Sequence, residues 1–308
     1  IWSAPAVLCV YAFTGIFIGM HNTRGAFVLQ LVLNITNMLL DVLFVLGFNW
    51  GVEGVAVASV LAEYLAMCLG FYLLRRPILT AFGHYNRARL LERTALLKLF
   101  SANTNIFIRT LCLLLAFSYF TAKSASQGEV ILAANAILLH LQSIMAYGLD
   151  GFAHAVEAMA GSAYGARRQS VFRRAVRLTS FWGAVIALLV GVVYFVFGAA
   201  IINLFTSIPA VAETALRYLP WMVVAPILSV WSFQLDGIFI GTGHTREMRN
   251  AMIFSLLAYL VLLQLVIPML GNHGLYLGLA FFMVIRALSL LFYFPGIEAA
   301  IQAASETD

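Results

Sequence analysis

Residues 15–24 read GIFIGMHNTR, and residues 237–246 read GIFIGTGHTR. Seven of these ten positions are identical, although the two copies lie 222 residues apart. A pair of glycines follows each copy at nearly the same distance, as GVEG at 51–54 and as GNHG at 271–274. The chain therefore contains an internal repeat, which predicts a fold that uses one arrangement of elements twice.

The composition is that of a membrane protein. Of the 308 residues, 63% are hydrophobic and 10% are charged, and the mean hydropathy is +0.95. Soluble domains carry about 25% charged residues, and a membrane-spanning helix needs about 20 mostly apolar residues. Apolar runs of that length predict an all-α polytopic protein with nine segments, near 2–20, 26–47, 54–75, 99–122, 130–162, 174–205, 211–241, 251–270 and 275–297.

The basic residues predict the orientation of these segments. Most of the 18 Lys and Arg residues follow the first, third, fifth and seventh segments, whereas Lys123 and Arg217 lie on the opposite side. Cytoplasmic loops of membrane proteins are enriched in Lys and Arg. We therefore expect a multi-pass protein of the plasma (inner) membrane with a cytoplasmic C-terminus.

Both copies of the repeat lead into a basic loop, so they have the same orientation in the membrane. Parallel repeats of this kind are related by an axis along the membrane normal and are typical of secondary transporters, whose substrate lies between the halves. The first copy has only residues 1–14 before its motif, whereas the second is preceded by several helices. We therefore expect three further helices ahead of Ile1, giving twelve in two lobes of six.

This organisation predicts four regions in the chain. Residues 1–76 form the three-helix remainder of an N-terminal lobe, and residues 77–98 form a cytoplasmic linker that Pro77 opens by ending the third helix. Residues 99–298 form a C-terminal lobe of six helices. Residues 299–308 form a cytoplasmic tail.

Three stretches resemble the multidrug and toxic compound extrusion (MATE) family, in its DNA-damage-inducible protein F (DinF) subfamily. They are NMLLDVLFVLGFNWGVEGVAVASVLAEY (37–64), LDGFAHAVEAMAGSAYGARR (149–168) and QLDGIFIGTGHTREMRNAM (234–252). The resemblance implies two six-helix bundles around a central cavity, of which this chain supplies helices 4 to 12. It also implies antiport, in which H⁺ or Na⁺ enters while an amphipathic or cationic compound leaves. The acidic residue on the family's first helix has no counterpart here.

The second segment carries four polar residues on one helical face: Gln30, Asn34, Asn37 and Asp41. Their steps of four, three and four place them one above another on a helix. An ionisable side chain at membrane depth is costly and marks a functional site by default. The resemblance assigns Asn37 and Asp41 to a proton-linked network on the family's fifth helix, with a hydroxyl matched by Ser59. The alternative is a hydrogen-bonded cluster that only packs helices.

A second set of acids lies in the other lobe. Asp150, His154 and Glu157 share one face, which suits a proton relay, because histidine titrates near physiological pH. The alternative is that Asp150 and Glu157 form ion pairs with the intramembrane Arg109 and Arg286. The spacing alone does not define a metal site, and we expect no metal and no cofactor.

Asp236 precedes the second GIFIG motif. The resemblance places it at an acidic position of the tenth helix that serves cation coupling in other branches, together with an acid on the seventh helix. Here the seventh helix offers Asn103, Asn105 and Arg109 but no acid. This departure favours H⁺ over Na⁺ as the coupling ion.

The leading hypothesis is thus an H⁺-coupled exporter of small amphipathic or cationic compounds, embedded in the lipid bilayer, monomeric and without a nucleic-acid partner. One alternative is a flippase for lipid-linked precursors in the same fold, which would need a strongly cationic cavity. Another is an inactive truncated fragment. An intramembrane enzyme is a third reading, but the sequence contains no H-E-x-x-H, G-x-S-x-G or G-x-x-x-x-G-K-[ST] motif.

Overall fold

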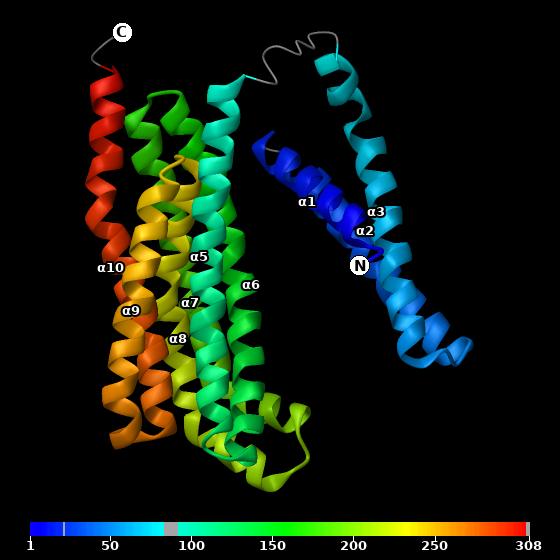
Figure 1. Cartoon of the computed structure of the whole chain (residues 1–308), viewed down its shortest axis with the longest axis vertical. Coiled ribbons are helices and arrows are strands. Elements are labelled where there is room, and N and C mark those ends of the chain that lie inside the picture. Colours follow the sequence, from blue (N-terminus) through cyan, green and yellow to red (C-terminus); the bar gives the residue numbers. More distant parts are fainter. Residues whose placement is uncertain (21, 83–91, 306–308) are drawn as a thin grey trace. The chain divides into compact units, whose positions relative to one another are not determined.

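The apolar segments of the sequence form helices in the computed structural model, which describes residues 1–20, 22–82 and 92–305 (Figure 1). No strand occurs in these ranges. The described chain divides into two units, Ile1–Glu92 and Arg93–Asp308. Eight of the described helices are long and apolar enough to cross a membrane. The protein is therefore an all-α, multi-pass integral membrane protein, as the composition predicts.

The first unit contains α1 (Ala4–Gly19), α2 (Thr23–Val42), the π-helix η1 (Leu43–Gly47) and α3 (Gly51–Phe82). With 16 residues, α1 is the one described α-helix too short to meet the length for a span. The three α-helices pack around a small apolar core built from Val10, Phe13, Phe17, Leu29, Ala66 and Leu74.

The helix α3 continues through Pro77 to Phe82, so the expectation that Pro77 ends the third helix is wrong. Proline removes one backbone hydrogen bond, and membrane helices tolerate this loss because neighbouring groups satisfy the freed backbone. Helix α5 begins at Arg93. Both ends of the stretch predicted as a linker are thus helical, and residues 83–91 lie outside the described residues.

The second unit is a bundle of six helices among its described residues: α5 (Arg93–Ala125), α6 (Glu129–Gly165), α7 (Gln169–Phe205), α8 (Pro209–Gly241), α9 (Thr245–Leu270) and α10 (Asn272–Ser305). Figure 1 shows them running side by side along most of their length. Helix α8 lies at the centre, packed against α6, α7 and α10, and more than half of its apolar span is buried. Helix α10 runs past residue 299, into the segment predicted as a tail.

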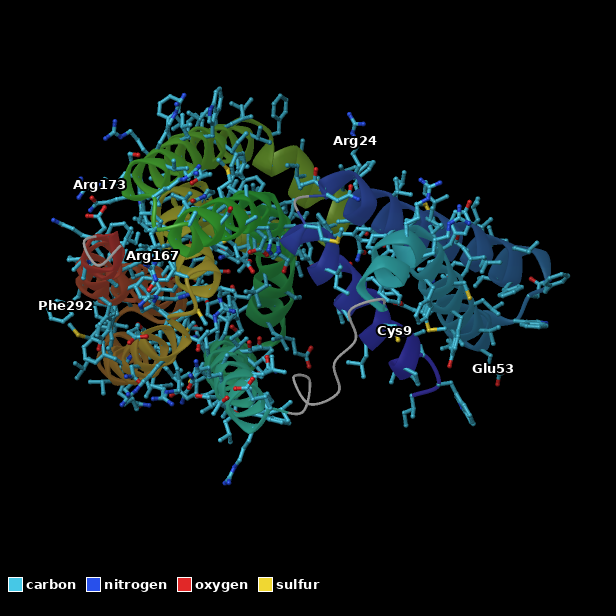
Figure 2. The ribbon with its side chains drawn as sticks, turned by 90° about the horizontal axis from the view of Figure 1, so that it is seen from above. Cys9, Arg24, Glu53, Arg167, Arg173 and Phe292 are labelled. Carbon is cyan, nitrogen blue, oxygen red and sulfur yellow. The ribbon has the colours of Figure 1, made fainter. Side chains whose placement is uncertain are left out.

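A bidentate ion pair joins the N-terminal end of α7 to the C-terminal part of α10. Arg173 Nε lies 2.9 Å from Glu298 Oε1, and Arg173 Nη2 lies 3.0 Å from Glu298 Oε2. Figure 2 shows Arg173 beside the α10 ribbon, while Phe292 points away from the bundle.

The two copies of the repeat have matching local structure. Helices α1 and α8 both end at the last glycine of GIFIG, and the following residue, Met20 or Thr242, bonds back to the equivalent two carbonyls. The first glycines of GVEG and GNHG both adopt a left-handed conformation, with φ of 58° at Gly51 and 54° at Gly271. Such backbone angles favour glycine, because it has no Cβ. These matches confirm that the repeat is structural.

Candidate functional site: polar residues within the membrane helices

The polar face of α2 meets α1 and α3 inside the first unit. Asn37 Nδ2 donates to Ser59 Oγ at 3.2 Å, and Ser59 in turn donates to the Val55 carbonyl of its own helix at 3.0 Å. Near the other end of α2, Gln30 Nε2 donates to Thr14 Oγ1 of α1 at 3.3 Å. The structure therefore brings Asn37 and Ser59 together, as the resemblance implies.

Asp41 stands one turn from Asn37 on the same helix. Its Oδ1 is buried and accepts no hydrogen bond from the residues that the structure describes. The Asn37 amide, one candidate donor, is already committed to Ser59. Asn34 Nδ2 donates to the Gln30 carbonyl at 2.8 Å, so this hydrogen bond stays within α2. Asp41 thus keeps an open acceptor beside a hydrogen-bonded pair.

The backbone changes just after Asp41. Residues Leu43–Gly47 form the π-helix η1, in which each turn holds an extra residue. Such insertions occur frequently at functional sites. Gly54 packs closely here, since a Cβ at this position would lie 3.0 Å from the Phe44 Cβ. The sequence reading missed this π-helix, because an apolar run such as LFVLG carries no signal that separates it from an α-helix.

The charged residues of the second unit converge on Asp236. Arg109 of α5 and Arg286 of α10 each donate through Nη2 to Asp236 Oδ2. Asp236 is 4% exposed and Arg286 is 1% exposed. Asp236 Oδ1 and the Nε atoms of both arginines are buried without a hydrogen-bond partner among the described residues. This cluster links three helices through one carboxylate.

The charges of this cluster do not cancel within it, since two guanidinium groups surround one carboxylate. Asp150 of α6 interacts electrostatically with both arginines, although it makes no ion pair with them among the described residues. The sequence suggested Asp150 and Glu157 as the acids that pair with the two arginines. The acid that contacts both is instead Asp236, because this residue of the buried helix α8 lies between α5 and α10.

Glu157 pairs with His154 on its own helix. His154 Nδ1 lies 3.3 Å from Glu157 Oε2, and the His154 side chain is 60% exposed. No group of three or more His, Cys, Asp or Glu side chains in the described ranges is arranged to hold a metal ion. Asp150, His154 and Glu157 therefore share a face of α6, with one direct contact among them.

Helix α8 owes its position against α6 to the GIFIG motif. A Cβ at Gly237 would collide with the Ala153 carbonyl oxygen, and a Cβ at Gly241 would collide with the Glu157 carbonyl oxygen. Small residues spaced four apart allow membrane helices to approach this closely. This contact sets the positions of Asp236 and Glu157. In the first copy, a Cβ at Gly15 or Gly19 would meet no described atom within 4 Å.

A second polar cluster joins α5, α6 and α10 and was not predicted. Asn135 Nδ2 donates to Ser124 Oγ and to Asn272 Oδ1, both at 2.7 Å, and Asn135 Oδ1 accepts from Asn272 Nδ2 and from the Tyr276 hydroxyl. The sequence feature that could have pointed to this cluster is the GNHG motif, which contains Asn272. Its equivalent in GVEG is Val52, so the cluster is particular to the second unit.

Comparison with known proteins identifies the family. Residues 106–265, just over half of the chain, match the MatE family. The chain is 39% identical over 288 residues to DNA damage-inducible protein F of Escherichia coli, covering 94% of this chain and 62% of that protein. It is 25% identical to Protein DETOXIFICATION 42 of Arabidopsis thaliana, covering 92% of this chain and 54% of that protein. It thus spans less than two thirds of these relatives.

Solved structures share the fold. The Vibrio cholerae MATE transporter VcmN in its bent form superimposes with a TM-score of 0.85 at 19% identity, covering 98% of this chain and 68% of that one. A MOP superfamily transporter from Pyrococcus furiosus gives 0.86 at 19% identity, covering 97% and 68%. With its matching sequence, its helical fold and its paired motifs, the chain belongs to the MatE family.

Proposed function

We propose that the protein is a secondary active antiporter that exports small amphipathic or cationic compounds in exchange for H⁺. Membership of the MatE family supports a transport role, as does the parallel repeat, which is typical of secondary transporters. One observation carries the choice of H⁺: Asp41 Oδ1 is a buried acceptor without a hydrogen-bond partner among the described residues, on a helix long and apolar enough to span a membrane. A carboxyl group in that setting can bind a proton directly.

The second unit supports H⁺ over Na⁺. A sodium site needs several oxygen ligands around one ion, and an acid on α5 would have to join Asp236. Instead α5 supplies Arg109, and Asp236 Oδ2 is occupied by two guanidinium groups. The same pairing argues against the flippase alternative, since the two intramembrane arginines are neutralised in part by Asp236 and do not form a free cationic surface.

The distribution of basic residues supports a placement in the plasma membrane with the C-terminus in the cytoplasm. Helices α6 and α8 end beside Arg167, Arg168 and Arg246, on the side where α10 also ends. We expect the protein to act as a monomer and to bind no nucleic acid.

The decisive experiment is Asp41→Asn in membrane vesicles that carry an imposed pH gradient. The substitution removes the ionisable proton site while keeping the size of the side chain. We expect at least a tenfold loss of gradient-driven movement of a cationic dye such as ethidium, with normal insertion of the protein. Glu53→Gln is the matched control, because Glu53 is an exposed acid at the start of α3. Unchanged transport in Asp41→Asn would remove the basis for this proposal.

A further inference from the structure

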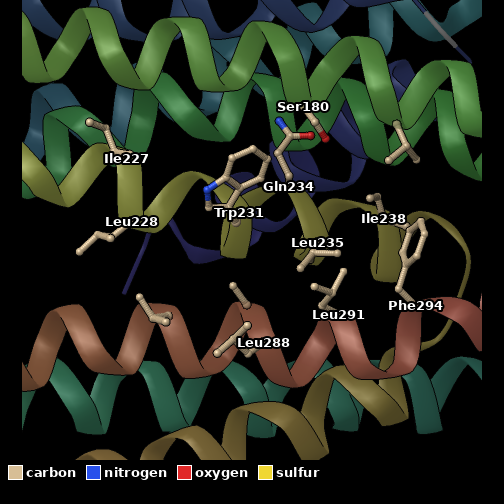
Figure 3. A pocket seen from close by; sticks show the side chains of 13 residues that line it. Ser180, Ile227, Leu228, Trp231, Gln234, Leu235, Ile238, Leu288, Leu291 and Phe294 are labelled. Carbon is tan, nitrogen blue, oxygen red and sulfur yellow. The ribbon is translucent and has the colours of Figure 1, made fainter.

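A cavity of about 570 Å³ lies between α7, α8 and α10 of the second unit. Figure 3 shows Trp231, Gln234 and Leu235 of α8 along it, with Ser180 on α7 and Leu288 and Leu291 on α10. Its volume falls within the range of about 300–1,000 Å³ that is usual for ligand pockets. None of the described residues that line it is charged, and Arg109, Arg286 and Asp236 are not among them.

Gln234 is a polar side chain in the wall whose amide has no hydrogen-bond partner in the described part of the chain. Gln234 is 2% exposed, and both its Nε2 and its Oε1 are buried without a hydrogen bond from any described residue. A buried amide costs free energy unless something pairs with it. Gln234 lines the cavity, so its amide is the polar group that a ligand in the cavity could pair with.

The neighbouring helix makes room for this amide. A Cβ at Gly183 of α7 would lie 2.9 Å from Gln234 Nε2, so a larger residue there would press on it. The position equivalent to Gln234 in the first copy of the repeat, 222 residues earlier, is Ala12. The amide is therefore not shared by the two copies of the repeat, and Gln234 is particular to the second copy.

The mouth of the cavity suits hydrocarbon. Trp231, Leu288 and Leu291 line it and are each about half exposed, at 46%, 55% and 53%. All three lie on helices that can span the membrane, so a chain in the bilayer can enter without crossing a polar barrier. A cationic group would find no counter-ion here, and an unpaired charge at membrane depth is expensive.

We infer that this cavity binds an uncharged amphiphile taken from the bilayer: a hydrocarbon chain along the apolar walls, ending in a hydroxyl or carbonyl group that pairs with the Gln234 amide. The site is separate from Asp41 and Asp236 and does not rest on the proposed antiport. The ligand of this cavity differs from the proposed antiport substrates, because the cavity excludes cations.

The test measures quenching of Trp231 fluorescence in the whole chain, reconstituted in lipid nanodiscs. The probes share one twelve-carbon chain brominated at its third and fourth carbons, which places the bromines near Trp231, one helical turn from Gln234. On the first carbon they carry a hydroxyl, no head group or an ammonium. Trp231→Phe gives the background from the other four of the five tryptophans. We expect the alcohol to quench Trp231 at about fivefold lower concentration than the headless alkane, which corresponds to one hydrogen bond, and the ammonium to quench least.

Two variants separate the amide from the cavity. In Gln234→Leu, the alcohol and the alkane should quench Trp231 at the same concentration. The quenching concentration of the alkane should not change from that of the unmodified protein, which also shows that the cavity is intact. Ala287→Phe, which fills the cavity from α10, should abolish saturable quenching, whereas Ala258→Phe on α9, outside the lining, should not. Equal quenching by alcohol and alkane in the unmodified protein would mean that ordinary bilayer hydrocarbon fills the groove and would overturn the inference. Preference for the ammonium would overturn it as well.

Discussion

Arg109 and Arg286 contact the same atom, Oδ2 of Asp236, while Oδ1 of that carboxylate accepts no hydrogen bond within the described part of the chain. The two arginines come from α5 and α10, and the acid comes from α8. Three helices are therefore held by a single oxygen atom at membrane depth. This shared contact predicts a structural role for Asp236, and that role can be tested separately from a role in ion coupling.

Asp236→Asn should destabilise the protein strongly. The change leaves two arginines facing a neutral side chain, and removing one partner of a buried ion pair costs about 3–5 kcal/mol. Thermal unfolding in detergent measures the loss, with Glu213→Gln, an exposed acid on the same helix, as the control.

A different result would reassign the residue. If Asp236→Asn unfolds at the same temperature as the unmodified protein but loses gradient-driven transport, then Asp236 takes part in coupling, as its position in the sequence resemblance implies.

Gly241→Ala should lower stability by about 1–3 kcal/mol, because the added Cβ meets the Glu157 carbonyl oxygen and forces α6 and α8 apart. Gly19→Ala in the first copy is a matched control from the same motif, since a Cβ there meets no described atom within 4 Å. It should be neutral, or stabilising by up to ~1 kcal/mol through the better helix propensity of alanine. Both are measured by thermal unfolding. Equal losses in the two variants would contradict this account of the α6–α8 contact.

The hydrogen bond between Asn37 and Ser59 should show as coupling in a double-mutant cycle. Interhelical hydrogen bonds in membranes contribute about 0.6 kcal/mol. Asn37→Ala and Ser59→Ala together should therefore cost less than the sum of the single changes by about that amount, measured by unfolding in mixed micelles. Strict additivity would show that the two side chains do not interact.

Asn272→Ala should destabilise the second unit by about 1–3 kcal/mol, because it leaves the buried Asn135 amide short of a partner. Asn203→Ala, at an exposed asparagine on α7, controls for loss of an amide in general. A small effect on thermal unfolding at Asn272 would indicate that water replaces the missing partner.

Gln234→Leu should raise the thermal unfolding midpoint in the absence of added amphiphile. It replaces a buried amide, which has no hydrogen-bond partner within the described ranges, by an apolar side chain of similar size. An unpaired buried group costs about 1–3 kcal/mol. Gln264→Leu is the comparison, since Gln264 donates to Tyr119 at 2.8 Å on an exposed surface. A lower midpoint for Gln234→Leu would show that its amide has a stabilising partner.

Much of the fold could be predicted from the sequence, because apolar runs and basic loops follow directly from the thickness of a bilayer and from the charge asymmetry across it. The repeat could be read from GIFIG alone. The end of α3 could not, because proline in a membrane helix removes one hydrogen bond without ending the helix when its surroundings compensate.

From residue spacing, the site was predictable only within single helices. Spacing placed Gln30, Asn34, Asn37 and Asp41 on one face, and the structure pairs Asn37 with Ser59. Which acid would meet Arg109 and Arg286 depended on the packing of α5, α8 and α10, about which residue spacing says nothing. That the Gln234 amide lacks a partner among the residues with described positions could not be predicted either, because only packing shows which polar groups are paired.

The oxygen shared by Arg109 and Arg286 also has a consequence for motion. Separating α5, α8 or α10 from the others exposes at least one charge to hydrocarbon, so such openings should be rare and slow. Backbone amides around Asp236 should then exchange with deuterated solvent only when the whole bundle unfolds. In the proposed transport cycle, the second unit would move as one rigid body, and shape changes would fall to segments outside this core.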